Sequence, residues 1–338
     1  MSDFASSGTA CDPGVGTANA SANGSGRPRG ALHGVLVVDK AAGMTSHDVV
    51  ARIRRIARQR EVGHAGTLDP MATGVLVVLL GEATKLTPWL TASDKRYEAK
   101  VAFGRATDSG DADGTPTSDE PIPIALRREL EGVLVHPTPL LDAAARSERD
   151  RAEQVPPGIS AVHVEGERAY ARVRRGEVVV LASRPVTVHA LSVDRADPLA
   201  ATLACALHVS KGYYVRAFAR DFAASLGTVA HLSALRRMAS GAFLLTDAVQ
   251  LPSLDAAGLE ASLIPCGAAA ARALPTLALG VEEVRLARQG KRFPWPIEDN
   301  VGAHAWLSPE GELVAVGEAR EGAACVIRGF FGAGSQAR

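Results

Sequence analysis

The residue best suited to chemistry is Asp69, which lies in the segment Gly63-His-Ala-Gly-Thr-Leu-Asp-Pro-Met-Ala-Thr-Gly74. The glycines and the proline of this segment predict a structured loop, and the apolar run Val75 to Leu80 after it predicts a strand. An aspartate held on rigid backbone where a ligand can approach is suited to acid, base or covalent carboxylate chemistry. It can also cap the turn by accepting hydrogen bonds from nearby amides, and spacing alone favours that structural role.

A second candidate cluster is the segment Ser210-Lys-Gly-Tyr-Tyr-Val-Arg216. A glycine turn there closes a strand and starts a helix, so aromatic and cationic side chains are presented together. Tyrosines are more often packing residues than catalytic ones, and Arg216 could be an ordinary surface charge. The residue types alone leave both interpretations open.

Metal and cofactor motifs are missing from the sequence. It contains no His-Glu-x-x-His, no Gly-x-Ser-x-Gly, no phosphate-binding Gly-x-x-x-x-Gly-Lys and no dinucleotide glycine fingerprint after a strand. The four cysteines show no Cys-x-x-Cys spacing, which indicates reduced thiols in the cytoplasm. We therefore predict that no cofactor and no metal takes part.

The acidic loop from Asp108 to Glu120 has some calcium-loop spacing, with Asp111 and Asp113 at positions 3 and 5. Position 1 is Ser109, which lacks the required carboxylate, and two prolines deny the flanking helices. Calcium binding is not expected.

The composition of the chain limits its class. Its 338 residues suit two domains, and its net charge of zero gives no global argument for nucleic-acid binding. Five arginines fall between Arg52 and Arg60, where they either contact phosphates or form a solvated helix face. No apolar run approaches the roughly 20 residues that span a bilayer, and residues 1 to 30 read as a disordered tail.

Hydrophobic periodicity predicts the elements that position these residues. A helix should begin at Thr45, which forms an approximate capping box with Asp48. Strands are predicted at 34–39, 97–103, 159–164, 178–181, 186–193 and 201–209, and helices at 126–133, 169–174, 215–226 and 231–238. The stretch at 134–154 is loosely patterned. Short β pieces are predicted at 303–307, 313–317 and 324–328.

The motifs also occur in a characteristic order. The chain carries Gly34-Val-Leu-Val-Val-Asp-Lys40, Gly43-Met-Thr-Ser46, the Asp69 segment, Asp94-Lys-Arg-Tyr97, the Arg216 segment and Ala230-His-Leu-Ser-Ala-Leu-Arg-Arg237. Together they resemble the signature of the bacterial tRNA pseudouridine synthase B (TruB) family over about residues 34–243.

This resemblance implies a fold and a function. The fold would be α+β, with a mixed, mostly antiparallel sheet flanked by helices in residues 31–272 and a small β-rich PUA-type RNA-binding domain in residues 273–330. The function would be isomerisation of uridine 55 in the T-loop of tRNA to pseudouridine, with the base flipped out of the stack. The partner would be the T-arm of tRNA, and the protein would be a cytoplasmic monomer.

The resemblance also implies roles for single residues. Asp69 would be the nucleophile, Tyr97 would lie against the target base, and Arg216 would pair with the catalytic carboxylate. A neighbouring arginine lowers an aspartate pKa by roughly 1–3 units. The expected substrate-binding residues are His64, Tyr214, Leu235, Lys40 and Asp111.

The chain departs from the family pattern in two places. It has Ile159 and His163 where the family commonly has an aromatic residue and a lysine, and the longer stretch from Leu134 to Gln154 predicts an extra surface loop. Two other classes stay open. A tRNA-binding folding factor would not need Asp69, and an aspartyl phosphotransferase would need a second carboxylate where Met71 stands.

Overall fold

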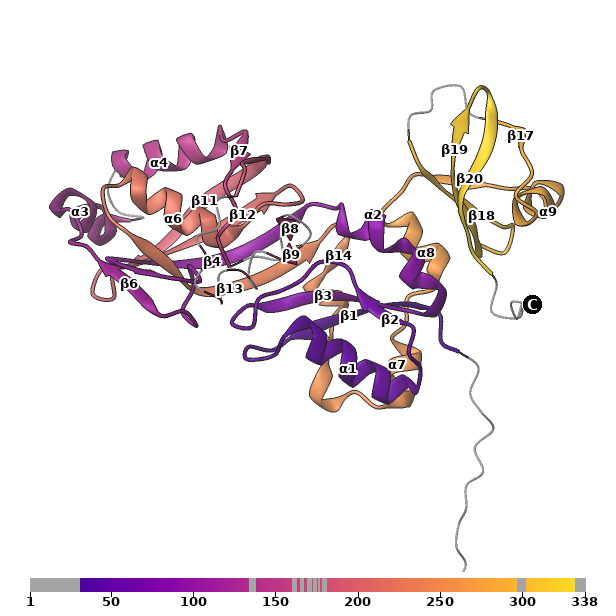
Figure 1. Cartoon of the computed structure of the whole chain (residues 1–338), viewed down its shortest axis with the longest axis horizontal. Helices are drawn as coiled ribbons and strands as arrows, with labels where there is room; N and C mark the ends of the chain where they lie inside the picture. Colours follow the sequence, from indigo (N-terminus) through magenta and orange to yellow (C-terminus); the bar gives the residue numbers. More distant parts are fainter. Residues whose placement is uncertain are drawn as a thin grey trace, which may run out of the picture. The chain divides into compact units, whose positions relative to one another are not determined.

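The computed structural model describes residues 31–133, 138–159, 163–164, 167–168, 172, 175, 177, 181–296 and 302–331. The tail predicted at 1–30 lies outside these residues, as do most of the helix predicted at 169–174, half of the strand predicted at 159–164, most of the strand predicted at 178–181, and the side chain of His163. The helices are α1 (Ser46–Ala57), α2 (Thr87–Thr91), α3 (Ile124–Gly132), α4 (Pro139–Arg149), α6 (Val215–Ser225), α7 (Ala256–Ala261), α8 (Cys266–Ala271) and α9 (Val281–Arg288) (Figure 1). None of the described helices is long and apolar enough to cross a membrane.

One large sheet organises most of the described chain (Figure 1). Its strand order is β11 (Val188–Asp197), β12 (Thr202–Val209), β4 (Lys95–Phe103), β13 (Ala230–Ser240), β3 (Thr73–Leu80), β1 (Gly34–Lys40) and β15 (Val249–Gln250), with β2 (Val62–His64) on β3 and β14 (Phe243–Leu244) on β13. The β13–β3 and β1–β15 pairs are parallel and the other pairs are antiparallel. The mixed, mostly antiparallel sheet predicted from the sequence is confirmed.

A second, smaller sheet is formed by the C-terminal strands. Its order is β16 (Thr276–Ala278), β18 (His304–Leu307), β19 (Leu313–Arg320), β20 (Ala323–Gly329) and β17 (Phe293–Pro294). Trp306 is fully buried at its centre and packs against Phe293. The predicted β-rich C-terminal module is confirmed.

Two-stranded pairs complete the β structure of the described residues: β5 (Arg105–Thr107) with β6 (Pro116–Asp119), β7 (Glu153–Gln154) with β10 (Arg184–Pro185), and β8 (His163–Val164) with β9 (Glu167–Arg168).

The large sheet is buried on both faces at β1 and β3. Alternate residues of these strands, such as Leu36 and Leu76, belong to a core that includes Phe218 of α6. The intervening residues, such as Val37 and Val77, belong to a second core on the other face. This two-sided burial explains why both strands read as continuous apolar runs.

One predicted helix is wrong. Residues 231–238 form most of β13, and not a helix. The ladder between β13 and β4 shifts register between Leu232 and Ala234, and again between Arg237 and Ala239. Each bulge resets the alternation of buried residues, so Leu232 and Leu235 are both buried at a spacing of three that imitates a helix.

The extra surface loop is also wrong where it can be checked. Residues 134–137 are outside the described part, but residues 139–149 form α4, which begins with a proline at its first turn. Leu141, Ala145 and Glu148 are buried, a stripe at helical spacing. Because alanines and a glutamate occupy much of that stripe, hydrophobicity alone did not reveal it.

Candidate active site

Asp69 and Arg216 form an ion pair between a loop and a helix. The Nε atom of Arg216 lies 2.9 Å from Oδ2 of Asp69, and Nη2 donates to Oδ1 at 3.3 Å. Arg216 is in the first turn of α6, after the N-cap residue Tyr214. Its side chain is only 7% exposed, while that of Asp69 is 34% exposed. The guanidinium is enclosed and the carboxylate stays within reach of a ligand.

The acidic loop between β5 and β6 contacts the same arginine. Arg216 Nη1 donates to the carbonyl of Ser109 at 2.6 Å, and its Nε lies 3.8 Å from Oδ2 of Asp111. The other carboxylate oxygen of Asp111 accepts from the Ser109 hydroxyl at 2.6 Å and from the Asp113 amide at 3.2 Å. The structure therefore brings together three residues predicted from sequence: Asp69, Asp111 and Arg216.

The protonation of Asp69 differs from the simple expectation. Burial raises the pKa of the Asp69 carboxyl above its ordinary value, Arg216 opposes this rise, and Asp111 adds to it. The expected lowering by Arg216 is present but is outweighed. Asp69 shares Arg216 with Asp111, so the arginine offsets only part of the cost of ionising the buried Asp69 carboxyl.

The loop that carries Asp69 is held by hydrogen bonds with side chains of α1 and β1. The buried hydroxyl of Ser46 donates to the carbonyl of Leu68 at 3.1 Å and accepts from its amide at 2.9 Å. Lys40 is fully buried, and its ammonium donates to the carbonyls of Pro70, Ala41 and Met44 at 3.2, 2.9 and 2.6 Å. Lys40 therefore helps to position the Asp69 loop, and its contact with substrate stays a prediction.

A second clamp comes from β13. Arg237 is 1% exposed, and its guanidinium donates to the carbonyls of Gly66, Thr67 and Val75 at 3.0, 3.3 and 2.7 Å. Among the described residues no carboxylate lies within ion-pair distance of it, so these carbonyls are what satisfies the buried charge. The Asp69 loop is thus held in one geometry before any substrate binds, as efficient catalysis requires.

Leu235 and Tyr97 lie near this loop. A cleft of about 970 Å³ is lined by Leu235, by Asp113 and by Met71, which is two residues beyond Asp69. Tyr97 is half-buried on β4, pairs in register with Arg237, and packs on the core cluster that contains Leu68. The cleft is at the upper end of the usual size range for ligand sites, about 300–1,000 Å³.

The remaining predicted residues occupy the ends of neighbouring elements. The amide of Tyr214 donates to Gln154 Oε1 at 2.8 Å, and Gln154 Nε2 donates back to the Tyr214 carbonyl at 3.2 Å. His64 ends β2 just before the Asp69 loop and meets His47 edge-on, with ring centroids 5.6 Å apart. Burial lowers the pKa of His64 most, and the nearby His47 and Arg237 lower it further, so the ring is neutral at neutral pH.

Comparisons with known proteins identify the family. The sequence model described as TruB family pseudouridylate synthase (N terminal domain) matches residues 54–215. A tRNA pseudouridine synthase B of Thermobifida fusca (strain YX) is 41% identical over 305 residues, covering 88% of this chain and 99% of the relative. The chain belongs to the TruB family. It is therefore a pseudouridine synthase, an isomerase that acts on RNA.

A second relative agrees with this assignment, and a solved structure shares the fold. The tRNA pseudouridine synthase B of Streptomyces coelicolor (strain ATCC BAA-471 / A3(2) / M145) is 40% identical over 299 residues, covering 86% of this chain and 95% of the relative. A solved structure described as an H/ACA RNP bound to a substrate RNA containing 2'-deoxyuridine has a TM-score of 0.64 at 21% identity, covering 89% of this chain and 86% of that one. The TruB chain thus shares the fold of that protein.

Several residues that shape this TruB site had no role in the sequence prediction. Ser46 and Arg237 are the last residues of two segments that carry the family resemblance. Their place in these segments was the signal that could have indicated a role at the site. Ser109 and Gln154 act through backbone contacts with Arg216 and Tyr214, for which the sequence gives no signal.

Proposed function

We propose that this protein converts uridine 55 in the T-loop of tRNA to pseudouridine, with Asp69 as the nucleophile. The observation that carries the proposal is the pairing of an accessible Asp69 carboxylate with the enclosed Arg216, on a loop whose carbonyls are held by buried side chains. Relatives about 40% identical are named tRNA pseudouridine synthase B, which supports tRNA as the substrate.

Base flipping accounts for the surroundings of Asp69. Chemistry on a base in a folded RNA requires the nucleotide to leave its stack, at a cost of a few kcal/mol. Stacking on an aromatic ring returns about 1–3 kcal/mol per base. We assign Tyr97 and Tyr214 to contact the flipped uridine, Leu235 to the cleft beside it, and His64 to the space that the nucleotide leaves.

RNA binding extends beyond the active site in this proposal. Arg55, Arg58 and Arg60 are exposed at the end of α1 and just after it, and they line one shallow depression. We assign them to tRNA phosphates, and residues 273–330 to a PUA-type RNA-binding domain beside the catalytic residues 31–272. The monomeric state and the cytoplasmic location stay predictions.

The deciding experiment measures tritium release from an unmodified tRNA transcript labelled at carbon 5 of its uridines. Isomerisation breaks the bond between N1 and the ribose, forms a bond from carbon 5 to the ribose, and releases the hydrogen of carbon 5 to water. Wild type should release tritium and Asp69→Asn should not, although it still binds tRNA. Asp119→Asn is the matched control, because Asp119 is an exposed aspartate that also pairs with an arginine, Arg105.

Other outcomes favour other functions. Release by Asp69→Asn at the wild-type rate would remove Asp69 from the reaction. Absence of release by wild type, with tRNA still bound and refolded, would favour the folding-factor alternative. Mapping the modified position in the product tRNA tests uridine 55 separately from the chemistry.

A further inference from the structure

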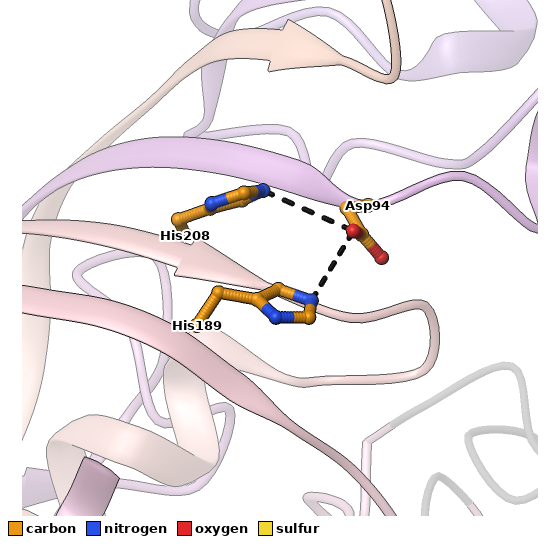
Figure 2. Close-up of side chains that lie close together, drawn as sticks. All are labelled: Asp94, His189 and His208. Atoms are coloured by element: carbon orange, nitrogen blue, oxygen red, sulfur yellow. Dashed lines mark ion pairs between the residues drawn. The ribbon is translucent and has the colours of Figure 1, made fainter.

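Three side chains that are far apart in the sequence converge at one edge of the large sheet. Asp94 precedes β4, His189 lies on β11, and His208 lies on β12 (Figure 2). His189 Nε2 is 3.2 Å from Asp94 Oδ2, and His208 Nε2 is 3.9 Å from the same oxygen. One donor atom from each residue lies within 4.8 Å of the others.

The backbone directs these side chains toward one another. His208 pairs in register with Arg96, which places it beside the start of β4. The ladder between β11 and β12 shifts register between Val188 and Ala190, so His189 stands in a bulge without a partner residue. Bulges re-aim side chains, and Figure 2 shows the His189 ring turned toward Asp94.

An ordinary ion pair does not account for the whole cluster. Asp94 is within hydrogen-bond distance of His189, but 3.9 Å to His208 is too long for a second hydrogen bond. The two imidazole rings nevertheless lie 4.7 Å apart, where two protonated rings would repel.

We propose that Asp94, His189 and His208 bind a divalent transition-metal ion such as Zn²⁺, with water completing the coordination. Atoms about 2.0–2.2 Å from a tetrahedral zinc ion are roughly 3.3–3.6 Å from one another. The donor atoms of His189 and His208 lie 3.2 and 3.9 Å from Asp94 Oδ2, and all three donor atoms lie within 4.8 Å of one another, so the side chains have to draw together to match. Imidazole suits zinc, copper and nickel, while Mg²⁺ and Ca²⁺ prefer oxygen ligands alone.

The ion has a structural role and takes no part in the isomerisation. It ties β11 and β12 to the start of β4, the strand that carries Tyr97. All three side chains are partly exposed, between 32% and 45%, so an ion can enter from solvent. An ion that binds only the folded chain raises its stability.

Zinc titration of the full-length protein by calorimetry tests the site. Wild type should bind one equivalent of Zn²⁺, and His189→Gln and His208→Gln should each weaken binding by about tenfold or more. His231→Gln, a histidine on β13 outside the cluster, is the matched control and should bind as wild type does. Zn²⁺ should raise the thermal midpoint of wild type and of the control only, and Mg²⁺ should raise none.

Equal zinc affinity in wild type and both cluster variants would overturn the proposal. Retained tritium release by His189→Gln and His208→Gln would show that both variants are folded. Zinc-edge anomalous scattering from wild-type crystals gives a decision that needs no variant. A peak between the three side chains supports the site, and its absence at saturating Zn²⁺ contradicts it.

Discussion

The two loops that meet at Arg216 are held in opposite ways. The loop over residues 65–72, which carries Asp69, is held from outside by Lys40, Ser46 and Arg237. The loop over residues 108–115, which carries Asp111, is held mainly by its own short-range bonds. In it, the Thr107 hydroxyl donates to the Asp111 carbonyl at 2.7 Å, and the Thr115 amide donates to Asp108 at 2.8 Å.

The difference matters for how each loop contributes to catalysis. A loop held by buried side chains of α1, β1 and β13 is positioned as precisely as the sheet itself, which suits the proposed nucleophile Asp69. The Asp111 loop satisfies many of its polar groups itself and has fewer outside bonds, from Arg216 to Ser109 and from the Leu232 amide to Gly110, which suits an auxiliary contact. Apart from Arg216, which contacts both loops, distant residues should therefore matter more for the Asp69 loop than for the Asp111 loop.

The largest effect is expected from Arg216→Gln, which removes the group that joins both loops. Asp69 and Asp111 would lose their shared positive partner, and kcat should fall about 10³-fold, as for loss of one key electrostatic contact. Single-turnover tritium release measures it, with Arg105→Gln as the control arginine that pairs with the exposed Asp119. A loss below tenfold would show that the two loops act independently of Arg216.

Arg237→Lys should have the next largest effect, because lysine keeps the positive charge but lacks the forked donors of the guanidinium. The compact ammonium of a lysine lacks the planar, spread donors with which Arg237 reaches Gly66, Thr67 and Val75, so the Asp69 loop should loosen and kcat should fall about 10- to 100-fold. KM should change less, since Arg237 is buried and its side chain is not available to a ligand. Arg128→Lys on the exposed face of α3 is the control. A change confined to KM would contradict the clamp.

Ser46→Ala and Ser109→Ala compare the two loops directly. Ser46→Ala leaves both polar groups of Leu68 buried without partners and should cost about 1–3 kcal/mol of stability, with about a tenfold lower kcat. Ser109→Ala removes the hydroxyl that donates to the Asp111 carboxylate and accepts from the Asp111 amide, but it leaves the Ser109 carbonyl bond to Arg216 intact, so its effects should be a fewfold at most. Urea unfolding and tritium release measure both. Equal losses would remove the distinction between the loops.

The smallest effect is a displacement of the acid side of the pH profile. Because the pKa of Asp69 is raised, kcat/KM should decline with acidification at a higher pH than for a normal aspartate. A raised pKa means that the fold favours the neutral acid, so stability is lost as pH rises and Asp69 ionises. Asp69→Asn should thus be at least as stable as wild type at neutral pH. Lower stability of Asp69→Asn would contradict this assignment.

The sequence predicted elements well where one rule governs a segment. The capping box of Thr45 and Asp48 is present in the structure, and α6 ends just before Gly227, which adopts a positive φ of 76°. Prediction failed at β13, because two bulges replaced strand alternation with helix-like spacing. It failed at α4 because the buried Glu148 accepts a hydrogen bond from Tyr213, 65 positions away, in addition to its local pair with Arg151.

The sequence by itself predicted Asp69 as the candidate reactive carboxylate and established the order of the motifs around it, because the resemblance to the family depends on residue types and their spacing along the chain. The tertiary structure alone decided which side chains hold that carboxylate in place. Ser46, Lys40 and Arg237 reach the Asp69 loop across 22, 30 and 171 positions of sequence. The convergence of Asp94, His189 and His208 likewise depends on strand register and a bulge. Register is set by the packing of the whole sheet, so local sequence does not reveal it.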